Sequence, residues 1–176
     1  MIIALTGNNG VGKDTVASII QTTLNRKIDF SDMQGEYESE RWKIKKFADL
    51  PNELYTKITN VKFGALEGHM KEAERRQFID FCQKNKDVFG SYIWVDSLLM
   101  DYRNEKKWII SDLRFLEEWS EMLKLDAVKI RIVREGYNDG MQEISHYKTD
   151  FTVYNNGDMI DLKDKVRDIL NELELL

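Results

Sequence analysis

Residues 7–15 read GNNGVGKDT, and they follow directly on the apolar run MIIALT at residues 1–6. The run is short, β-branched and uninterrupted, which is typical of a strand buried on both faces of a parallel sheet. After the loop, apolar residues recur at helical spacing between Lys13 and Arg26. The sequence therefore predicts a strand, a glycine-rich loop and a helix in that order, as in an α/β fold.

The loop has the spacing G-x-x-x-x-G-K of a phosphate-binding P-loop. In such a loop, backbone N–H groups and the N-terminus of the helix face a bound phosphate, and side chains would block that approach. Lys13 adds a mobile positive charge that can follow a transferred phosphoryl group. The residues expected to bind the phosphates of a nucleotide are Gly7, Asn8, Asn9, Gly10, Val11, Gly12, Lys13, Asp14 and Thr15.

The position after the lysine departs from the strict motif. Asp14 stands where the motif has Ser or Thr, and the first hydroxyl comes one residue later, at Thr15. A hydroxyl next to the lysine would contact Mg²⁺. Thr15 is therefore a candidate metal ligand whose direct contact with the ion is left open.

The rest of the chain alternates between strand and helix patterns. Further strands are predicted at 42–48, 107–111, 127–133 and 151–154, and helices at 49–58, 69–82, 87–102, from 115 onwards and at 161–175. The helix from 115 onwards is expected to point Phe115, Trp119, Met122 and Leu123 inward. The pattern indicates a three-layer α/β/α fold of the P-loop kinase kind, a single domain over 1–176 with about five parallel strands. Residues 51–102 are expected to form a helical insertion that binds the acceptor, and residues 135–148 a short lid or loop.

Composition limits the partners and the compartment. The chain has 176 residues, 42% of them hydrophobic, and a formal net charge of -5, which argues against nucleic acid as the main partner. Small anionic ligands remain compatible with this charge. Cys82 is the single cysteine, so no intramolecular disulfide can form and a cytoplasmic location is expected. The apolar runs are too short to span a membrane.

A second group of candidate phosphate ligands follows the strand KWIIS at residues 107–111. Asp112 lies at the tip of that strand, where an acidic residue can orient Mg²⁺ or its waters beside a nucleotide. The alternative is that Asp112 caps the helix starting at Phe115. Arg114 comes two residues later, where its guanidinium can clamp a phosphate. We predict Asp112 as a catalytic and metal-binding residue and Arg114 as a catalytic and substrate-binding one.

Other arginines are weaker candidates. Arg134 lies at the carboxyl end of a predicted strand, where ligands bind in such sheets, and it is favoured over Arg131 as a catalytic residue. Arg75 and Arg76 are candidate substrate-binding residues, with a solvated helix face as the equal alternative. No Cys–His pair is evident, and transfer between two phosphates needs none. A sugar hydroxyl as acceptor would call for a carboxylate base, such as Asp49.

Five stretches together resemble a known family. They are GNNGVGKDT, KIKKFADLP, FGSYIWV, WIISDLRFLEE and DFTVYNNGDMIDL, and in order and spacing they cover nearly the whole chain. The chain is similar to the deoxynucleoside monophosphate kinases carried by bacteriophages. The resemblance implies that Asp49 and Glu118 hold the acceptor, and that Asn155 and Gly157 lie near the donor adenine. A plain Asn-Gly turn is the alternative for the last two.

The expected activity is transfer of the γ-phosphoryl group of ATP, with Mg²⁺, to a deoxynucleoside 5′-monophosphate. Trp94 is a candidate for stacking on the acceptor base, although a tryptophan on an apolar helix face is more often part of a core. Two other functions are left open: a P-loop kinase of another small acceptor such as dephospho-coenzyme A, and a non-catalytic nucleotide-binding switch. The base preference and a homodimer are left open too. If the chain is encoded by a phage, the compartment is the host cytoplasm.

Overall fold

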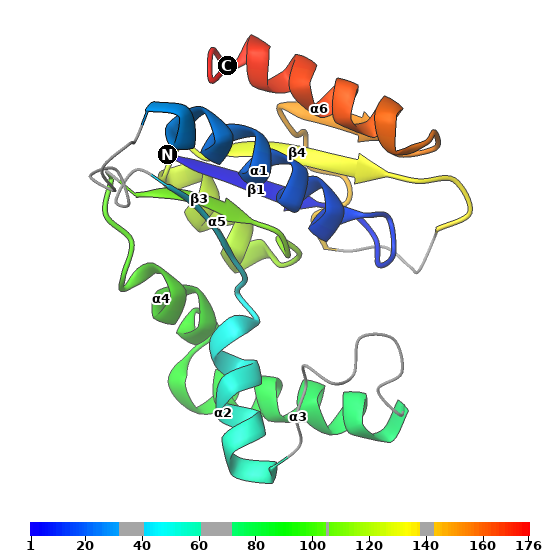
Figure 1. Ribbon diagram of the computed structural model, residues 1–176. Coiled ribbons are helices and arrows are strands. Elements are labelled where there is room, and N and C mark those ends of the chain that lie inside the picture. The colour runs from blue at the N-terminus through cyan, green and yellow to red at the C-terminus, as the bar shows by residue number, and fades with distance from the viewer. Residues whose placement is uncertain (32–40, 61–71, 105, 138–142) are drawn as a thin grey trace. The chain divides into compact units, whose positions relative to one another are not determined.

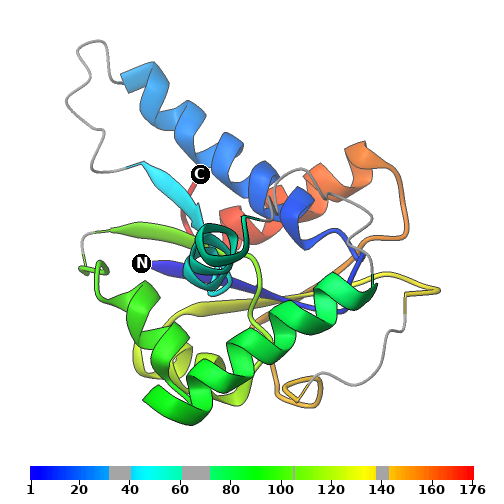
Figure 2. The ribbon, with the colours of Figure 1, turned by 90° about the horizontal axis from the view of Figure 1, so that it is seen from below.

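A computed structural model describes residues 1–31, 41–60, 72–104, 106–137 and 143–176. Within these residues, five strands form one sheet in which every neighbouring pair is parallel. The spatial order is β2-β3-β1-β4-β5 (Figure 1). The strands are β1 (Ile2–Thr6), β2 (Trp42–Lys45), β3 (Lys107–Ile110), β4 (Val128–Val133) and β5 (Phe151–Tyr154). Figure 2 shows β1 lying between β3 and β4.

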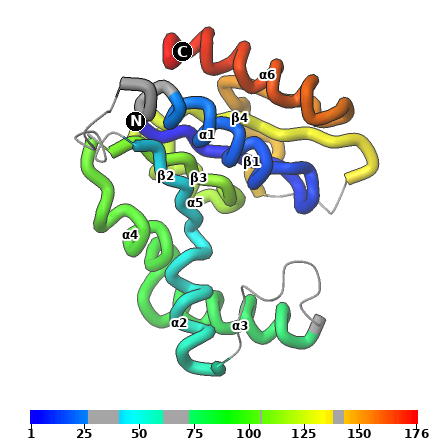
Figure 3. The backbone as a smooth tube through the Cα atoms, in the orientation of Figure 1, coloured from blue at the N-terminus to red at the C-terminus, as the bar shows by residue number. Residues whose placement is uncertain are grey.

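Helices cover both faces of this sheet. The chain leaves β1 toward β2 through α1 (Lys13–Ser31) and leaves β3 in the opposite direction, toward β4, through α5 (Leu116–Lys124). Because crossovers between parallel strands are right-handed, opposite directions place the two helices on opposite faces. The closing helix α6 (Met159–Glu172) lies beside α1, as the tube in Figure 3 shows. The predicted three-layer α/β/α arrangement with five parallel strands is confirmed.

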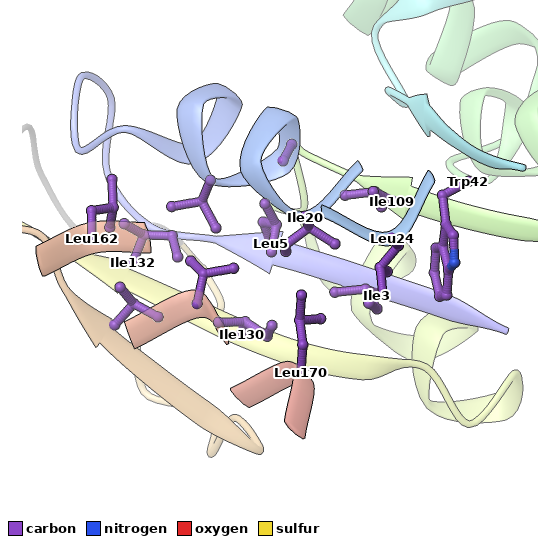
Figure 4. Close-up of a cluster of buried hydrophobic side chains, with 14 of the residues drawn as sticks. Ile3, Leu5, Ile20, Leu24, Trp42, Ile109, Ile130, Ile132, Leu162 and Leu170 are labelled. Carbon is purple, nitrogen blue, oxygen red and sulfur yellow. The ribbon is translucent and has the colours of Figure 1, made fainter. Parts of the chain in front are cut away.

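The main core fills the space between the sheet and the α1–α6 layer. Alternate residues of the strands, such as Ile3 and Leu5 of β1, point into it and are fully buried, and Ile20 of α1 and Leu170 of α6 meet them (Figure 4). Ile2 and Ala4 alternate with these residues and are buried on the opposite face. This burial on both faces explains the unbroken apolar run before the glycine-rich loop.

The chain divides into two compact units, Met1–Lys46 with Arg103–Leu176, and Phe47–Tyr102. The second unit holds α2 (Asp49–Thr59), α3 (Glu72–Phe89) and α4 (Ile93–Leu99). Its aromatic core brings Tyr55 edge-on to Phe81, with ring centroids 5.4 Å apart, and Phe81 next to Trp94 at 6.2 Å. The sequence predicted an insertion at 51–102, and its role in binding an acceptor stays a prediction.

Three details of the predicted elements are wrong. The boundary expected between helices near residues 82–87 lies at Gly90, whose φ of +97° is readily adopted by glycine and ends α3. Strand β2 ends at Lys45 instead of continuing to residue 48. Phe115 and Leu123, expected to point inward, are 43% and 54% exposed, because the buried face of α5 is carried by Trp119 and Met122.

Two further predictions concern residues outside the described ranges. The first three residues of the helix expected at 69–82 lie there, as do residues 138–142 of the expected lid. Among the helices that the structure does describe, none combines the length and the apolar character that crossing a membrane requires.

Candidate functional site

The glycine-rich loop connects the carboxyl end of β1 to the first turn of α1. Gly7 and Gly12 have φ angles of +139° and +100°, which side-chain-bearing residues rarely adopt. A Cβ on Gly7 would also lie 2.2 Å from the carbonyl oxygen of Ile132 in β4. The loop thus depends on glycine both for its backbone angles and for its close approach to the neighbouring strand. Its N–H groups and the N-terminus of α1 lie at the ligand-binding edge of the sheet.

Lys13 is held by this same loop. Its Nζ donates to the carbonyl oxygens of Gly7 and Asn8, each 2.7 Å away, and the residue is only 7% exposed. A neutral carbonyl oxygen is a weaker partner for an ammonium than an anionic phosphate oxygen, because the attraction between opposite charges adds to the hydrogen bond. The side chain is therefore placed so that an arriving phosphate can replace its present acceptors.

Asp14 joins the loop to the ends of two strands. One of its oxygens, Oδ1, accepts a hydrogen bond from Ser111 Oγ at 2.8 Å and lies 2.9 Å from Lys46 Nζ. Partial burial raises the pKa of this carboxyl, but the hydrogen bonds from Lys46 and Ser111 and the charges of Lys46 and Lys13 outweigh it, so the net pKa is lowered. Asp14 is therefore a carboxylate at neutral pH.

The tip of β3 is fixed between its two neighbouring strands. The N–H of Ser111 donates to the carbonyl oxygen of Lys45, and that of Leu113 to the carbonyl oxygen of Leu5. Asp112 lies between them, half-buried, at the carboxyl edge of the sheet. Arg114 follows, and its Nε is buried without a hydrogen-bond partner. An unpaired buried donor is costly, so this nitrogen fits a site that an anion completes.

Glu118 is placed differently from what the resemblance implies for it. Its Oε2 accepts hydrogen bonds from the backbone N–H of Arg114, at 2.7 Å, and of Phe115, at 3.1 Å, and the residue is 6% exposed. These are backbone donors at the start of α5, which a carboxylate in the first helical turn satisfies. Glu118 thus supports the segment that carries Arg114, and its contact with an acceptor stays a prediction.

The end of β4 supplies the two arginines that the sequence analysis compared. Arg131 donates to the carbonyl oxygens of Ile144, Ser145 and Tyr147 and so anchors the segment before β5. The guanidinium of Arg134 lies over the ring of Tyr137, 5.0 Å from its centroid. Both arginines line a pocket of about 190 Å³ at the carboxyl ends of β1 and β4, together with Asn8 and Tyr137.

The connection between β5 and α6 contacts the glycine-rich loop. Asn155 Nδ2 donates to the carbonyl oxygen of Val11 at 2.8 Å and lies 2.5 Å from where a Cβ of Gly12 would be. Gly157 follows in a turn, and a Cβ there would come within 2.3 Å of Asp161 Oδ2. The structure therefore brings Asn155, which the sequence placed near the donor, against the loop itself.

The candidates in the second unit are described separately. Asp49 is exposed in the first turn of α2, and Arg75 and Arg76 are exposed on α3. Trp94 is 7% exposed, and its Nε1 donates to the carbonyl oxygen of Cys82 at 3.3 Å. Trp94 thus packs as a core residue, which was the alternative weighed from the sequence. The substrate-binding roles of these four residues stay predictions.

Lys46, Ser111 and Tyr137 belong to the site and were not predicted. Asn8 Nδ2 donates to the carbonyl oxygen of Tyr137, and a Cβ on Gly10 would lie 2.7 Å from the Tyr137 ring. Asn8 and Tyr137 are 129 positions apart in the chain, and no local pattern signals such a contact. The doubled lysine of KIKKFADLP, inside the strand predicted at 42–48, was the available signal for Lys46.

Magnesium is compatible with the residues at this edge. Asp112 and Asp14 supply carboxylate oxygens, the ligand type that Mg²⁺ prefers, and Thr15 is exposed in the first turn of α1. Among the described residues, no group of three or more acidic, His or Cys side chains could enclose an ion. This sparse set suits an ion held largely by water and nucleotide phosphates, as is usual for Mg²⁺ at kinase sites.

Comparison with known proteins identifies solved structures only. No protein-family model matches the chain, and no curated protein matches its sequence. The shikimate kinase of Aquifex aeolicus aligns over 99% of this chain and 96% of its own, with 19% identity and a TM-score of 0.45. The APS kinase CysC of Mycobacterium tuberculosis, solved with AMPPNP and APS, aligns over 98% and 96%, with 11% identity and a TM-score of 0.48.

Proposed function

We propose that the protein is an ATP-dependent kinase that phosphorylates deoxynucleoside 5′-monophosphates to diphosphates. The observation that carries the proposal is the meeting of a P-loop and the tip of β3 at one edge of a parallel sheet. Lys13 and the N-terminus of α1 provide one set of donors, and Arg114, with its unpaired buried Nε, provides another on the adjacent strand. Two such sets suit a reaction that joins two phosphate groups.

The residues of the site have different proposed roles in such a phosphoryl transfer. The loop from Gly7 to Thr15 binds the donor phosphates, while Lys13 and Arg114 stabilise the charge on the phosphoryl group in transit. Asp112 is the residue proposed to orient Mg²⁺, which when bound would neutralise charge between the donor phosphates. Arg134 reaches the transferred group once it leaves the ring of Tyr137. Asn155 braces the loop through Val11, on the side where the resemblance places the donor adenine.

An acceptor phosphate requires little further chemistry from the protein. Its oxygen is already anionic at neutral pH, so no general base is needed, and alignment and charge neutralisation supply most of the rate enhancement. The deoxynucleoside part of the acceptor rests on the five sequence stretches that resemble the phage kinases. Asp49, Arg75, Arg76 and Trp94 are the proposed acceptor residues.

Turnover of a panel of acceptors tests the proposal. Purified protein with Mg-ATP is offered dAMP, dCMP, dGMP and dTMP, the four ribonucleoside monophosphates, dephospho-coenzyme A and shikimate, and ADP release is measured with product analysis. We expect at least one deoxynucleoside monophosphate to be converted to its diphosphate. Phosphorylation of dephospho-coenzyme A or shikimate and of no deoxynucleoside monophosphate would assign the other kinase class.

A matched control separates a kinase from a nucleotide-binding switch. A switch binds ATP or GTP, but no monophosphate stimulates its hydrolysis. Lys13→Ala in the same assay should lose the acceptor-dependent ADP release and keep the slow background, whereas Lys163→Ala, an exposed lysine on α6, should behave as the wild type. A wild type that binds Mg-ATP and shows no stimulation with any acceptor would contradict the kinase assignment.

A further inference from the structure

Lys46 lies one residue beyond the carboxyl end of β2, on the side of the sheet where β3 ends. Its Nζ is 2.9 Å from Asp14 Oδ1, and the same oxygen accepts the hydrogen bond from Ser111, the residue before Asp112. Three segments that end at the edge of the sheet are thus joined through one carboxylate oxygen. The ammonium of Lys46 lies between the first turn of α1 and the tip of β3.

The ion pair is too exposed to be explained by stability alone. The side chains of Lys46 and Asp14 are 37% and 71% exposed, and an exposed pair of this kind contributes at most about 1 kcal/mol to the free energy of unfolding. What the pair does fix is the position of a flexible cation. Asp14 therefore acts on the site by holding the ammonium of Lys46 beside the P-loop.

The charges at this edge favour an anion near Lys46. Phosphates bound by the loop bring several negative charges to a place where Lys13 and Arg114 already supply two positive ones. Asp14, at the position where a P-loop usually has a hydroxyl, brings a negative charge of its own. A third cation next to Asp14 offsets that charge and can donate up to three hydrogen bonds.

We propose that Lys46 is a phosphate-binding residue of this site and that Asp14 is the residue that positions it. The ligand is a phosphoryl group, either the terminal phosphate of the donor or the phosphate of the acceptor, bound between the loop and the tip of β3. The proposal rests on the kinase function proposed above. It assigns a role to the lysine of KIKKFADLP and to the aspartate of the P-loop.

The test compares Lys46→Met, Lys46→Arg and Asp14→Asn with the wild type. Calorimetry gives the Kd of Mg-ATP alone, and steady-state kinetics give kcat and the KM of the acceptor. We expect Lys46→Met to lower kcat/KM by about tenfold or more, the loss of one charge-assisted hydrogen bond to a phosphate, and Lys46→Arg to restore most of it. A higher Kd for Mg-ATP assigns Lys46 to the donor, and a higher KM for the acceptor assigns it to the acceptor.

A double-mutant cycle tests the positioning role. If Asp14 acts through Lys46, then adding Asp14→Asn to Lys46→Met costs little more than Lys46→Met alone, because the residue it positions is already gone. Additive losses would overturn that part of the proposal. Lys43→Met is the matched control, since Lys43 is an exposed lysine of β2 itself, and we expect it to leave every parameter unchanged.

Two outcomes overturn the role of Lys46. One is Lys46→Met with unchanged Kd, kcat and KM. The other is a loss that Lys46→Arg fails to restore and that follows a fall in melting temperature, which would indicate a structural role. If the wild type phosphorylates no acceptor, the proposed kinase function is contradicted, independently of the role of Lys46. The Kd of Mg-ATP in Lys46→Met then tests that role, and an unchanged Kd overturns it.

Discussion

Asn155 donates its side-chain amide to the backbone carbonyl oxygen of Val11, 2.8 Å away, and so ties the connection after β5 to the middle of the P-loop. The two residues are 144 positions apart in the chain. The amide also fills the space next to Gly12. The shape of the loop is therefore set partly by the segment that follows β5, the edge strand of the sheet.

The first prediction concerns this contact. Asn155→Ala removes a hydrogen bond and leaves the carbonyl of Val11 without that donor, which costs about 1 kcal/mol of stability. Because the loop is then less fixed, we expect the Kd of Mg-ATP to rise several-fold. Calorimetry measures the Kd of Mg-ATP, and thermal unfolding measures the loss of stability. Thr152→Ala, an exposed change on β5, is the control, and an unaltered Kd in Asn155→Ala would show that the loop keeps its shape without the amide.

The second prediction concerns Lys13. Lys13→Ala should retain the fold, because the hydrogen bonds of the ammonium to Gly7 and Asn8 lie within the loop, and it should lower kcat by about a hundredfold or more, as removal of one donor to a developing charge commonly does. Circular dichroism checks that the fold is retained, and steady-state kinetics measure kcat. A normal kcat would remove the lysine from the mechanism.

The third prediction concerns the start of α5. Glu118→Ala leaves the partly buried N–H groups of Arg114 and Phe115 without the Glu118 carboxylate as acceptor, and we expect a loss of about 1–2 kcal/mol in the free energy of unfolding. Chemical denaturation measures it. Glu117→Ala, one residue earlier on the same helix, should change stability by much less. If stability is unchanged while the acceptor KM rises, Glu118 contacts the substrate as the resemblance implies.

The fourth prediction concerns acid. The pKa of Asp14 is lowered in the folded protein by Lys46 and Ser111, so its charge stabilises the fold above the unfolded pKa, and that contribution disappears as the pH falls through the folded value. We expect the difference in unfolding free energy between wild type and Asp14→Asn to be below about 1 kcal/mol near neutrality, because the side chain is well exposed. This difference in unfolding free energy should become smaller below about pH 4. A difference that grows on acidification would contradict the lowered pKa.

The sheet and the loop were predictable because their signals are local. Five strand patterns alternate with segments in which apolar residues recur at helical spacing, and GNNGVGK lies between the first strand and the first helix. Each of these patterns can be recognised within a window of about 15 residues. The contacts that complete the site are not local: Ser111 and Asp14 are 97 positions apart, and Asn8 and Tyr137 are 129 apart. Gly90 was visible in the sequence, and its habit of ending helices would have corrected the boundary of α3.

The central place of β1 has a consequence for the order in which the protein acquires its shape. Ile3 pairs with Ile109 on one side and with Val128 on the other, so β1 leaves the ribosome long before either of its neighbouring strands is made. Such non-local pairing makes folding slow. Because the carbonyl of Ile132 packs against Gly7, the loop should bind its proposed nucleotide only in chains whose synthesis has passed β4, and nucleotide capture during translation would report that β4 has joined the sheet.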